Sequence, residues 1–518
     1  MSVAGSAGAS TPASTLGRAP ESEPVTAPAT TGAPNLIPLQ ETFIADCETP
    51  VSAFLKLREL APGEPAFLLE SAEQGQRMGR YSFIGFRPRA VLRWSLGDPG
   101  DPYALAAAAV AESRQAPLQD DEGELPFMGG AVGFFGYDLV RTVEPLGPPN
   151  EDRLGLPDMA LMLTDAVVAF DHLKHTITIL ANADLAAEPD PELAKLAARR
   201  TIAEVRECLA GPVPSPRSRE AGATGEDGTR AAPTGLQAPR VESNMSRERF
   251  EAMVERIVEY VYAGDAFQVV PSQRWSAEVP VEAFSIYRGL RTVNPSPYMY
   301  FLDFGDFQIA GASPEPLLTV TGKHVSTRPI AGTRPRGSSL EEDRRIADEL
   351  LADEKERAEH MMLVDLGRND LGRVCAYGSV VVDELMSVET YSHVIHIVSS
   401  VSGTLREDVG AMDALRSALP AGTLSGAPKV RAMQIIDELE STKRGGYGGA
   451  IGYLSYSGDL DTAIHIRTVV IKDGVAHVQA GGGTVADAKP EYEYEESVNK
   501  SKAVLRAVEL ACEQADWG

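Results

Sequence analysis

One segment limits the architecture of this 518-residue chain more than any other: residues 212–244, where large aliphatic side chains are almost absent. The segment is rich in Pro, Gly, Ser, Arg and Glu, a composition typical of flexible linkers and long surface loops. We therefore expect the hydrophobic core to come from two folded units, residues 36–211 and residues 245–518. The chain is long enough for two or more ordinary domains.

The N-terminal 35 residues differ from both units. Residues 1–35 consist mostly of Ala, Ser, Thr, Pro and Gly, without an apolar run that resembles a signal-peptide core, so we expect a disordered tail. The apolar stretch Ala104–Ala111 is too short and too rich in alanine to cross a bilayer. The sequence thus predicts no membrane association.

Charge excludes further classes of protein. The formal net charge is −26, whereas nucleic acids and anionic membranes are bound by basic surfaces, so we expect neither as a partner. An acidic protein that binds an anionic substrate must reverse the field locally, with Arg, Lys, backbone N–H groups or a divalent cation.

The four cysteines indicate a reducing compartment. None belongs to a C-x-x-C pair and none lies in a Gly-flanked nucleophile turn; they are Cys47, Cys208, Cys375 and Cys512. This usage fits a cytoplasmic protein and disfavours a disulfide scaffold or a cysteine-rich zinc site.

Strand and helix signals are mixed along the chain. Period-2 or continuous apolar runs bounded by Gly, Pro and Asp predict strands at Ala66–Leu69, Tyr81–Phe86, Ala160–Leu163, Ile177–Leu180, Ala266–Val270, Val380–Val382, His396–Ser399 and Ile464–Ile471. Helices are predicted at about 191–210, after Ser246, after Ser338-Ser339 and at about 493–514. Without a regular βαβ rhythm, the pattern favours an α+β fold over a doubly wound sheet.

The turn Pro329–Arg334 suits an oxyanion. Gly332 lets backbone N–H groups approach a ligand, the Thr333 hydroxyl donates, and Arg334 adds positive charge. An ordinary surface turn can have the same composition, so this motif indicates a binding site only in combination with the motifs described below.

Two acidic pairs repeat one spacing. Glu356 with Glu359, and Glu493 with Glu496, are three residues apart, which puts both carboxylates of each pair on one helix face. A solvated acidic face is the usual explanation of one such pair. Two pairs could together hold Mg²⁺, which takes one or two protein carboxylates and fills its remaining positions with water and substrate oxygens.

Other segments offer donors for a carboxylate substrate. Arg467 could bind one bidentately, Tyr447 has a hydroxyl within a Gly-rich stretch, and Gly481–Gly483 could form a backbone nest. The alternative explanations are a solubilising charge on an edge strand for Arg467, aromatic packing over a turn for Tyr447, and an ordinary turn for Gly481–Gly483. The segment Gly422–Lys429 does not have the glycine spacing of a P-loop.

On a strand, His393 and His396 point to opposite faces, so a two-histidine metal site is not expected. One of the two is expected to be structural. The near-neutral pKa of histidine suits the other for acid–base work.

Together these motifs resemble the chorismate-utilising enzymes, and most closely the large subunit (component I) of anthranilate synthase. The resemblance covers most of residues 245–510 and, more loosely, residues 36–190. It implies an α+β fold, a large mixed domain of orthogonally packed antiparallel β-sheets flanked by helices in four α/β/β/α layers, with the N-terminal and C-terminal units packed together.

The resemblance also implies the site residues. The magnesium ligands would be Glu359 and Glu496, backed by Glu356 and Glu493. The catalytic residues would be His396, Gln268 and Thr333, with His396 as acid or base in an elimination. Chorismate would be held by Gly332, Thr333, Tyr447, Arg467, Gly481, Gly482, Gly483 and Lys429.

Two positions separate the members of this family. Members that add water carry a lysine where this chain has Gln268, and an amide cannot deprotonate water. Members that make 4-amino-4-deoxychorismate commonly carry a lysine nucleophile where this chain has Ala331. Amination at C2 followed by loss of pyruvate then gives anthranilate, the first step of tryptophan synthesis. Another chorismate-aminating activity and a silent tryptophan sensor remain as alternatives.

The resemblance implies two further partners. Because no cysteine nucleophile is evident, a separate glutamine amidotransferase subunit is expected to supply ammonia within a hetero-oligomer. L-Tryptophan is expected to inhibit by binding Ser71, Pro297, Tyr298 and Met299, which makes residues 36–211 a regulatory unit and residues 245–518 the chorismate-binding catalytic unit. Tyr298 and Met299 would supply apolar surface for an indole, and Ser71 a polar handle.

Overall fold

The computed structural model describes residues 32–72, 79–118, 125–214, 239–391 and 394–514. Most of the predicted tail at 1–35, most of the segment 212–244 and the candidate His393 lie outside these ranges. Within them, no helix is long and apolar enough to cross a membrane.

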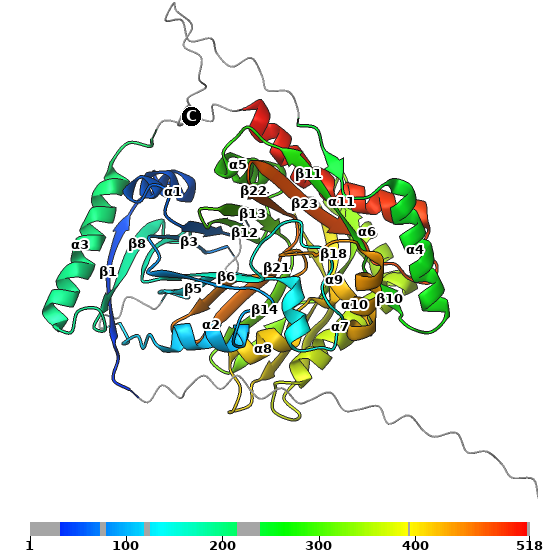
Figure 1. Ribbon diagram of the computed structural model, residues 1–518, viewed down its shortest axis with the longest axis horizontal. Coiled ribbons are helices and arrows are strands. Elements are labelled where there is room, and N and C mark those ends of the chain that lie inside the picture. Colours follow the sequence, from blue (N-terminus) through cyan, green and yellow to red (C-terminus); the bar gives the residue numbers. More distant parts are fainter. Residues whose placement is uncertain (1–31, 73–78, 119–124, 215–238, 392–393, 515–518) are drawn as a thin grey trace, which may run out of the picture.

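Two large sheets form the centre of the molecule (Figure 1). The eleven-stranded sheet has the order β1 (Leu36–Ile44), β8 (Thr176–Asp184), β7 (Ala166–Asp171), β3 (Tyr81–Phe86), β2 (Ala66–Glu70), β12 (Tyr298–Asp303), β13 (Phe307–Ser313), β22 (Thr468–Lys472), β23 (Val475–Gly481), β11 (Ser272–Glu278) and β9 (Glu242–Ser243). The ten-stranded sheet has the order β16 (Ile330–Pro335), β18 (Val394–Thr404), β15 (His324–Thr327), β14 (Pro316–Thr321), β21 (Leu460–Ile464), β20 (Ala450–Ser455), β5 (Gly130–Phe135), β6 (Met159–Thr164) and β4 (Ala90–Trp94), with β17 (Val381–Thr390) on the free side of β18.

Every ladder between named strands is antiparallel, which confirms the predicted α+β class. A third, two-stranded sheet joins β10 (Gln268–Val269) to β19 (Gly426–Ala427). The helices are α1 (Pro50–Leu57), α2 (Pro102–Ala111), α3 (Pro191–Ala210), α4 (Arg247–Tyr262), α5 (Ala283–Val293), α6 (Leu340–Ala352), α7 (Glu354–Gly372), α8 (Ala411–Ala418), α9 (Gly422–Ser425), α10 (Lys429–Leu439) and α11 (Pro490–Glu513).

The two units predicted from the sequence share both sheets. In the eleven-stranded sheet, β2 pairs with β12, so Glu70 lies opposite Met299. In the ten-stranded sheet, β5 pairs with β20. Strands from either side of residues 215–238 are therefore neighbours in the middle of each sheet, and the two units are packed together as predicted.

The core has three apolar layers. One lies between the sheets and contains side chains of both, such as Phe67 and Phe134. A second lies under α1, α3, α5 and α11 on the outer face of the eleven-stranded sheet, and a third lies under α2, α7 and α8 on the ten-stranded sheet. The order of layers is helix, sheet, sheet, helix.

Capping residues set the start of the helices that carry the site. Ser339 accepts from the N–H of Glu342, and α6 begins directly after it, as its capping signal predicts. Asp353 caps α7 by accepting from the N–H groups of Lys355 and Glu356. The first turn of α7 therefore places Glu356 at a defined position.

The predicted strand Ile464–Ile471 is wrong as one element. β21 ends at Ile464 and β22 begins at Thr468, and the two strands belong to different sheets. The chain crosses between the sheets at residues 465–467, where Arg467 has a φ of +52°. Both pieces are buried, so their apolar patterns run together in the sequence and conceal the break.

A buried ion pair connects several segments of the C-terminal half. Arg444 and Glu440 are 3% and 6% exposed, and Nη2 of Arg444 lies 2.5 Å from Oε1 of Glu440. Arg444 also donates to the carbonyls of Leu424 at 2.6 Å and Val270 at 2.7 Å. Glu440 accepts from the N–H and hydroxyl of Ser272. The pair thereby joins α9, the chain between β10 and β11, and the end of α10.

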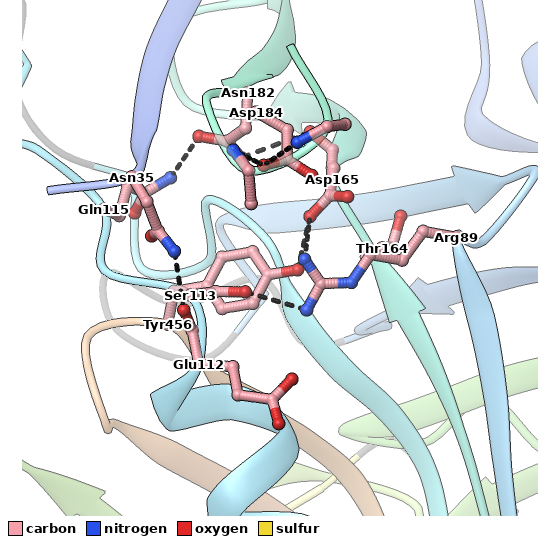
Figure 2. A network of polar contacts seen from close by, with 12 residues as sticks. Asn35, Arg89, Glu112, Ser113, Gln115, Thr164, Asp165, Asn182, Asp184 and Tyr456 are labelled. Carbon is pink, nitrogen blue, oxygen red and sulfur yellow. Dashed lines mark hydrogen bonds and ion pairs between the residues drawn. The ribbon is translucent and has the colours of Figure 1, made fainter. Parts of the chain in front are cut away.

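A second polar network fastens the N-terminal half to the β20–β21 hairpin (Figure 2). The Tyr456 hydroxyl donates to Asp165, in the turn between β6 and β7. Arg89 reaches the same carboxylate at 3.5 Å and donates to Ser113 at 2.7 Å. Hydrogen bonds between distant segments thus hold the far end of the hairpin that leads into β21.

Removing one partner of the buried pair should be costly. Glu440→Ala leaves the Arg444 guanidinium buried without its carboxylate, and we expect a loss of about 3–5 kcal/mol in the free energy of unfolding. Guanidinium chloride denaturation measures it. The matched control is Glu349→Ala, which breaks an exposed pair with Arg345 and should cost about 0–1 kcal/mol. Equal losses in the two variants would contradict the importance of the buried pair.

Candidate active site

The candidate acid–base histidine lies on β18, opposite Thr333 of β16. Its Nδ1 is 3.2 Å from the carbonyl oxygen of Gly332 and 3.1 Å from the Thr333 hydroxyl. A carbonyl oxygen can only accept, so Nδ1 of His396 carries the proton and Nε2 keeps its lone pair. Gly332 has a φ of +64° at a bulge in β16, a conformation that favours glycine. Burial lowers the pKa of His396, which keeps the ring neutral near pH 7.

The first acidic pair lies on α7, beside the same bulge. Glu356 accepts from Nη1 of Arg334 at 2.8 Å, and a Cβ on Gly332 would lie 3.2 Å from the Glu356 carboxylate. Glu359 accepts from the side-chain amide of Gln268 at 3.0 Å. Burial raises the pKa of Glu359, and the charge of Glu356 raises it further.

The second acidic pair lies near the start of α11, against the Gly-rich turn. Glu493 is 7% exposed, and one of its carboxylate oxygens has no hydrogen-bond partner. A Cβ on Gly482 would come within 3.0 Å of the Glu496 carboxylate and 3.2 Å of that of Glu493, so the close approach requires glycine. Burial raises the pKa of Glu493 to about 7, and the charge of Glu496 adds to the rise.

The four carboxylates act on one another across two helices. Glu496 raises the pKa of Glu359, and Glu359 raises that of Glu493, so α7 and α11 bring both pairs to one place. Mutually repelling carboxylates, one of which has an unpartnered oxygen, fit a divalent cation. In the ranges that the structure describes, no three His, Cys, Asp or Glu side chains form a metal cage. Mg²⁺ does not require one, since it keeps water and substrate oxygens.

Arg467 lies close enough to Tyr447 and Glu496 for their charges to act on it. Arg467 donates to the backbone carbonyl of Lys500, and its positive charge contributes to lowering the pKa of His396. Burial lowers the pKa of Arg467, while Tyr447 and Glu496 oppose that change. Burial raises the pKa of Tyr447, whose hydroxyl has a backbone hydrogen bond with Gly481. The phenol therefore stays protonated and can donate.

The sequence-based prediction missed two charged residues of this site. Glu315, between β13 and β14, accepts from the Thr423 hydroxyl at 3.0 Å and lines a pocket with Thr423 and Pro329. Burial raises the pKa of Glu315 to about 7, and the charge of Lys500 lowers it. Lys500 lies 2.7 Å from Glu496 and donates to the carbonyl of Gly481. Its position one helical turn after Glu496 is a signal that could have identified it.

Lys429 has a different environment from the other predicted substrate-binding residues. Its ammonium lies 2.9 Å from both carboxylate oxygens of Asp370 and 3.2 Å from the carbonyl oxygen of Ala418. These bonds tie the start of α10 to the end of α7, which is a structural use of the charge.

The predicted effector residues meet where β2 and β12 pair. Ser71 directly follows β2, and the N–H of Ala72 donates to the carbonyl of Ser296. The Tyr298 hydroxyl donates to Asp461 of β21 at 3.0 Å. Met299 is 3% exposed and packs in the core layer under the helices, on the opposite face from Tyr298. The two side chains therefore lie on opposite faces of β12, and their role in binding an effector stays a prediction.

Comparisons with known proteins agree on one family. The model of the family described as chorismate binding enzyme matches residues 64–506. The chain is 48% identical over 496 residues to anthranilate synthase component 1 of Pseudomonas putida, with 92% of this chain and 96% of the relative covered. It is 48% identical over 483 residues to the protein of that name from Thermus thermophilus, with coverage of 92% and 98%.

Solved structures agree with these relatives. Anthranilate synthase component I from Streptococcus pneumoniae matches with a TM-score of 0.72 at 40% identity, covering 84% of this chain and 95% of that one. The menaquinone-specific isochorismate synthase of Escherichia coli matches with a TM-score of 0.65 at 17% identity, covering 92% and 97%, which shows a shared fold.

The acidic cluster makes stability depend on pH. The folded pKa of Glu493, about 7, lies above its ordinary value of 4.5, so its contribution to stability is lost as pH rises through about 7. In EDTA at pH 8, Glu493→Gln should therefore be more stable than the unaltered chain by roughly 1–3 kcal/mol, and the difference should fall below about 1 kcal/mol at pH 5.

Denaturant unfolding at both pH values measures this difference. Glu491→Gln, on the exposed side of the same helix turn, is the control and should change little at either pH. A Glu493→Gln chain that is less stable at pH 8 would show that the carboxylate is not repelled in the folded state.

Proposed function

This chain belongs to the chorismate-binding enzyme family, together with the anthranilate synthase component 1 proteins, and we propose that it converts chorismate and ammonia into anthranilate and pyruvate. The observation that carries the proposal is Gln268. Its amide lies in the acidic site, 3.0 Å from Glu359, and has no basic group with which to activate water. Ammonia needs no such activation. Ala331, on β16, has no nucleophilic side chain.

Chorismate is a dicarboxylate, and the site offers matching donors. Arg467 can bind one carboxylate with its guanidinium, and the Tyr447 hydroxyl can donate to it. The N–H groups of Gly481–Gly483 add uncharged donors. Lys500 supplies a second positive charge beside Glu496. These residues reverse, within the site, the field of a chain whose net charge is −26.

We assign Mg²⁺ to the acidic cluster, with Glu359 and Glu496 as its ligands and Glu356 and Glu493 behind them. When bound, the ion holds a substrate carboxylate and neutralises the charge that these side chains concentrate. Two features support the assignment because they leave room for an ion beside the carboxylates. One oxygen of Glu493 has no hydrogen-bond partner, and Gly482 has no Cβ where the carboxylates of Glu493 and Glu496 approach it.

In the first step, nitrogen bonds to C2 of chorismate, the ring double bonds shift, and the C4 hydroxyl leaves. Hydroxide is a poor leaving group and needs a proton. Glu315, with a pKa of about 7, holds one near neutral pH and is the general acid we assign. The hydroxyl departs as water, and the new ammonium group returns one proton to the Glu315 carboxylate.

In the second step, the aminated intermediate loses its enolpyruvyl group. The neutral His396 accepts the proton from C2 at Nε2, while Thr333 and the Gly332 carbonyl hold the ring at Nδ1. Electrons of the C2–H bond form the last double bond of the aromatic ring as the C3–O bond breaks. The proton held by His396 then goes to the departing enolate, which becomes pyruvate.

Ammonia from glutamine requires a second protein in this proposal. Two of the cysteines, Cys375 and Cys512, are buried, and Cys47 and Cys208 lie in the N-terminal half outside the site. We therefore propose a complex with a glutamine amidotransferase subunit, as the designation component 1 of the relatives also suggests. The product would serve as the first intermediate committed to tryptophan in the cytoplasm.

Regulation by L-tryptophan is the remaining part of the proposal. Ser71, Pro297 and Tyr298 lie at the junction of β2 and β12, and Tyr298 bonds to β21, the strand that leads toward Arg467. An amino acid bound at this junction with a preference for a less active arrangement would inhibit.

Anthranilate fluorescence tests the proposal directly. The chain is given chorismate, Mg²⁺ and ammonium at mildly alkaline pH, and product should form and vanish with EDTA. Glu359→Gln and Glu496→Gln should each lower the rate by more than about 100-fold without unfolding the chain, because each removes a charged metal ligand. Glu349→Gln, on an exposed face of α6, is the control. Chorismate consumed without anthranilate would indicate another product, and untouched chorismate would favour a silent sensor.

His396→Met should separate the two steps. Without the imidazole, loss of pyruvate should slow by about 100- to 10,000-fold, and an aminated intermediate that retains its enolpyruvyl group should accumulate. Mass spectrometry of the quenched reaction detects it. His324→Met, at the exposed first residue of β15, should behave as the unaltered chain does. Full activity of His396→Met would make that residue structural.

Ser71→Ala should relieve inhibition while turnover is retained. Loss of one hydrogen bond to the amino acid should raise the inhibitory tryptophan concentration about tenfold. Inhibition curves for the variant and for Ser95→Ala, in the turn after β4, give the comparison. If the curves coincide, the effector does not bind at this junction.

A further inference from the structure

Directly after the metal ligand Glu359, α7 carries a histidine that does not reach the site. His360 is 0% exposed, and its Nε2 lies 2.6 Å from the Ser399 hydroxyl. Ser399 is itself 1% exposed and lies on β18, three residues after His396. One hydrogen bond thus connects the helix of the carboxylates to the strand of the acid–base histidine.

The Ser399 side chain has a second partner, which leaves its hydroxyl proton unused. Its oxygen accepts from the N–H of Met386 on β17 at 2.9 Å, and its backbone N–H donates to the carbonyl of Pro329 at 3.1 Å. The hydroxyl proton is then available to donate to Nε2 of His360. Nε2 of His360 is the atom that this hydroxyl reaches.

This bond is directional, as is the pair of Glu356 with Arg334 of β16 in the first turn of α7, whereas the contacts further along the helix are apolar. Leu363, Val364 and Leu371 of α7 are buried hydrophobic side chains. Apolar contacts resist separation but allow a helix to slide or rotate. The pair of Asp370 with Lys429, near the end of α7, ties the helix to α10 and not to β18, and the pair of Glu356 with Arg334 ties it to β16. His360 is therefore placed to set the register of α7 against the catalytic strand.

We propose that His360 is a positioning residue: its hydrogen bond with Ser399 holds Glu359 in a fixed relation to His396. The inference rests on the metal assignment of the proposed function and concerns the geometry of that site. A helix free to shift would still fold and would still carry Glu359, but the two acidic pairs would no longer meet at one ion.

Isothermal titration of the full chain with MgCl₂ tests the inference without using turnover. His360→Phe keeps the volume and the apolar packing and removes the acceptor, and Ser399→Ala removes the donor. Each should raise the dissociation constant of Mg²⁺ about tenfold. His360→Gln offers a side-chain amide at similar reach and should restore the constant to within about threefold. Met361→Ala, at the next position and 37% exposed, is the matched control and should leave the constant unchanged.

A purely structural role gives a different pattern. His360→Phe would then lower the midpoint of thermal unfolding in EDTA while Mg²⁺ affinity stayed as in the control, which would overturn the inference. Ser399→Ala keeps the test decisive if His360→Phe does not fold. If the unaltered chain binds no Mg²⁺, both the metal assignment and this inference fail. If it binds Mg²⁺ and the Ser399→Ala and control constants agree, only the inference fails.

Discussion

The buried pair of Arg444 and Glu440 is the interaction on which the site depends most. Neither charge faces solvent, and each is satisfied by groups from chain segments that are otherwise unconnected. Through Val270 the pair holds the segment next to Gln268. Arg444 also lies 5.6 Å from the ring centre of Tyr447, so the same guanidinium supports the tyrosine that we propose as a substrate donor. The buried guanidinium of Arg444 thus contacts three segments that lie beside the site.

The site forms where the polypeptide passes from one sheet to the other. α7 covers the ten-stranded sheet and α11 covers the eleven-stranded sheet, and each contributes one acidic pair. Arg467 lies in the short passage between β21 and β22, where the backbone leaves one sheet for the other. Carboxylates are thereby gathered from two helices and a guanidinium from the crossing between them. No single element of the fold contains the chemistry, although all of these residues come from the unit at 245–518, whose sheets the N-terminal unit completes.

Much of the site was predictable because its residues repeat a spacing or lie in Gly-rich motifs. The pairs beginning at Glu356 and Glu493, and the segment Pro329–Arg334, are recognisable in this way. Glu315 was missed because a single charge has no pattern and its role comes from neighbours distant in sequence, whereas the only sign of Lys500 in the sequence is its place one helical turn after Glu496. The break at Arg467 was hidden by burial of both strands. The core position of Met299 follows from strand alternation, which depends on pairing that the sequence does not reveal.

The pairing of β2 with β12 and of β5 with β20 has a consequence for the continuity of the chain. Residues 32–214 and 239–514 contribute neighbouring strands to the interior of both sheets. A polypeptide cut between these ranges would consist of two fragments, each with unpaired strand edges in place of a finished sheet. Neither fragment alone could pair the backbone N–H and C=O groups of these edge strands, but each contains the strands with which the other pairs. The division visible in the sequence is therefore a site for fragment complementation, not a boundary between independent modules.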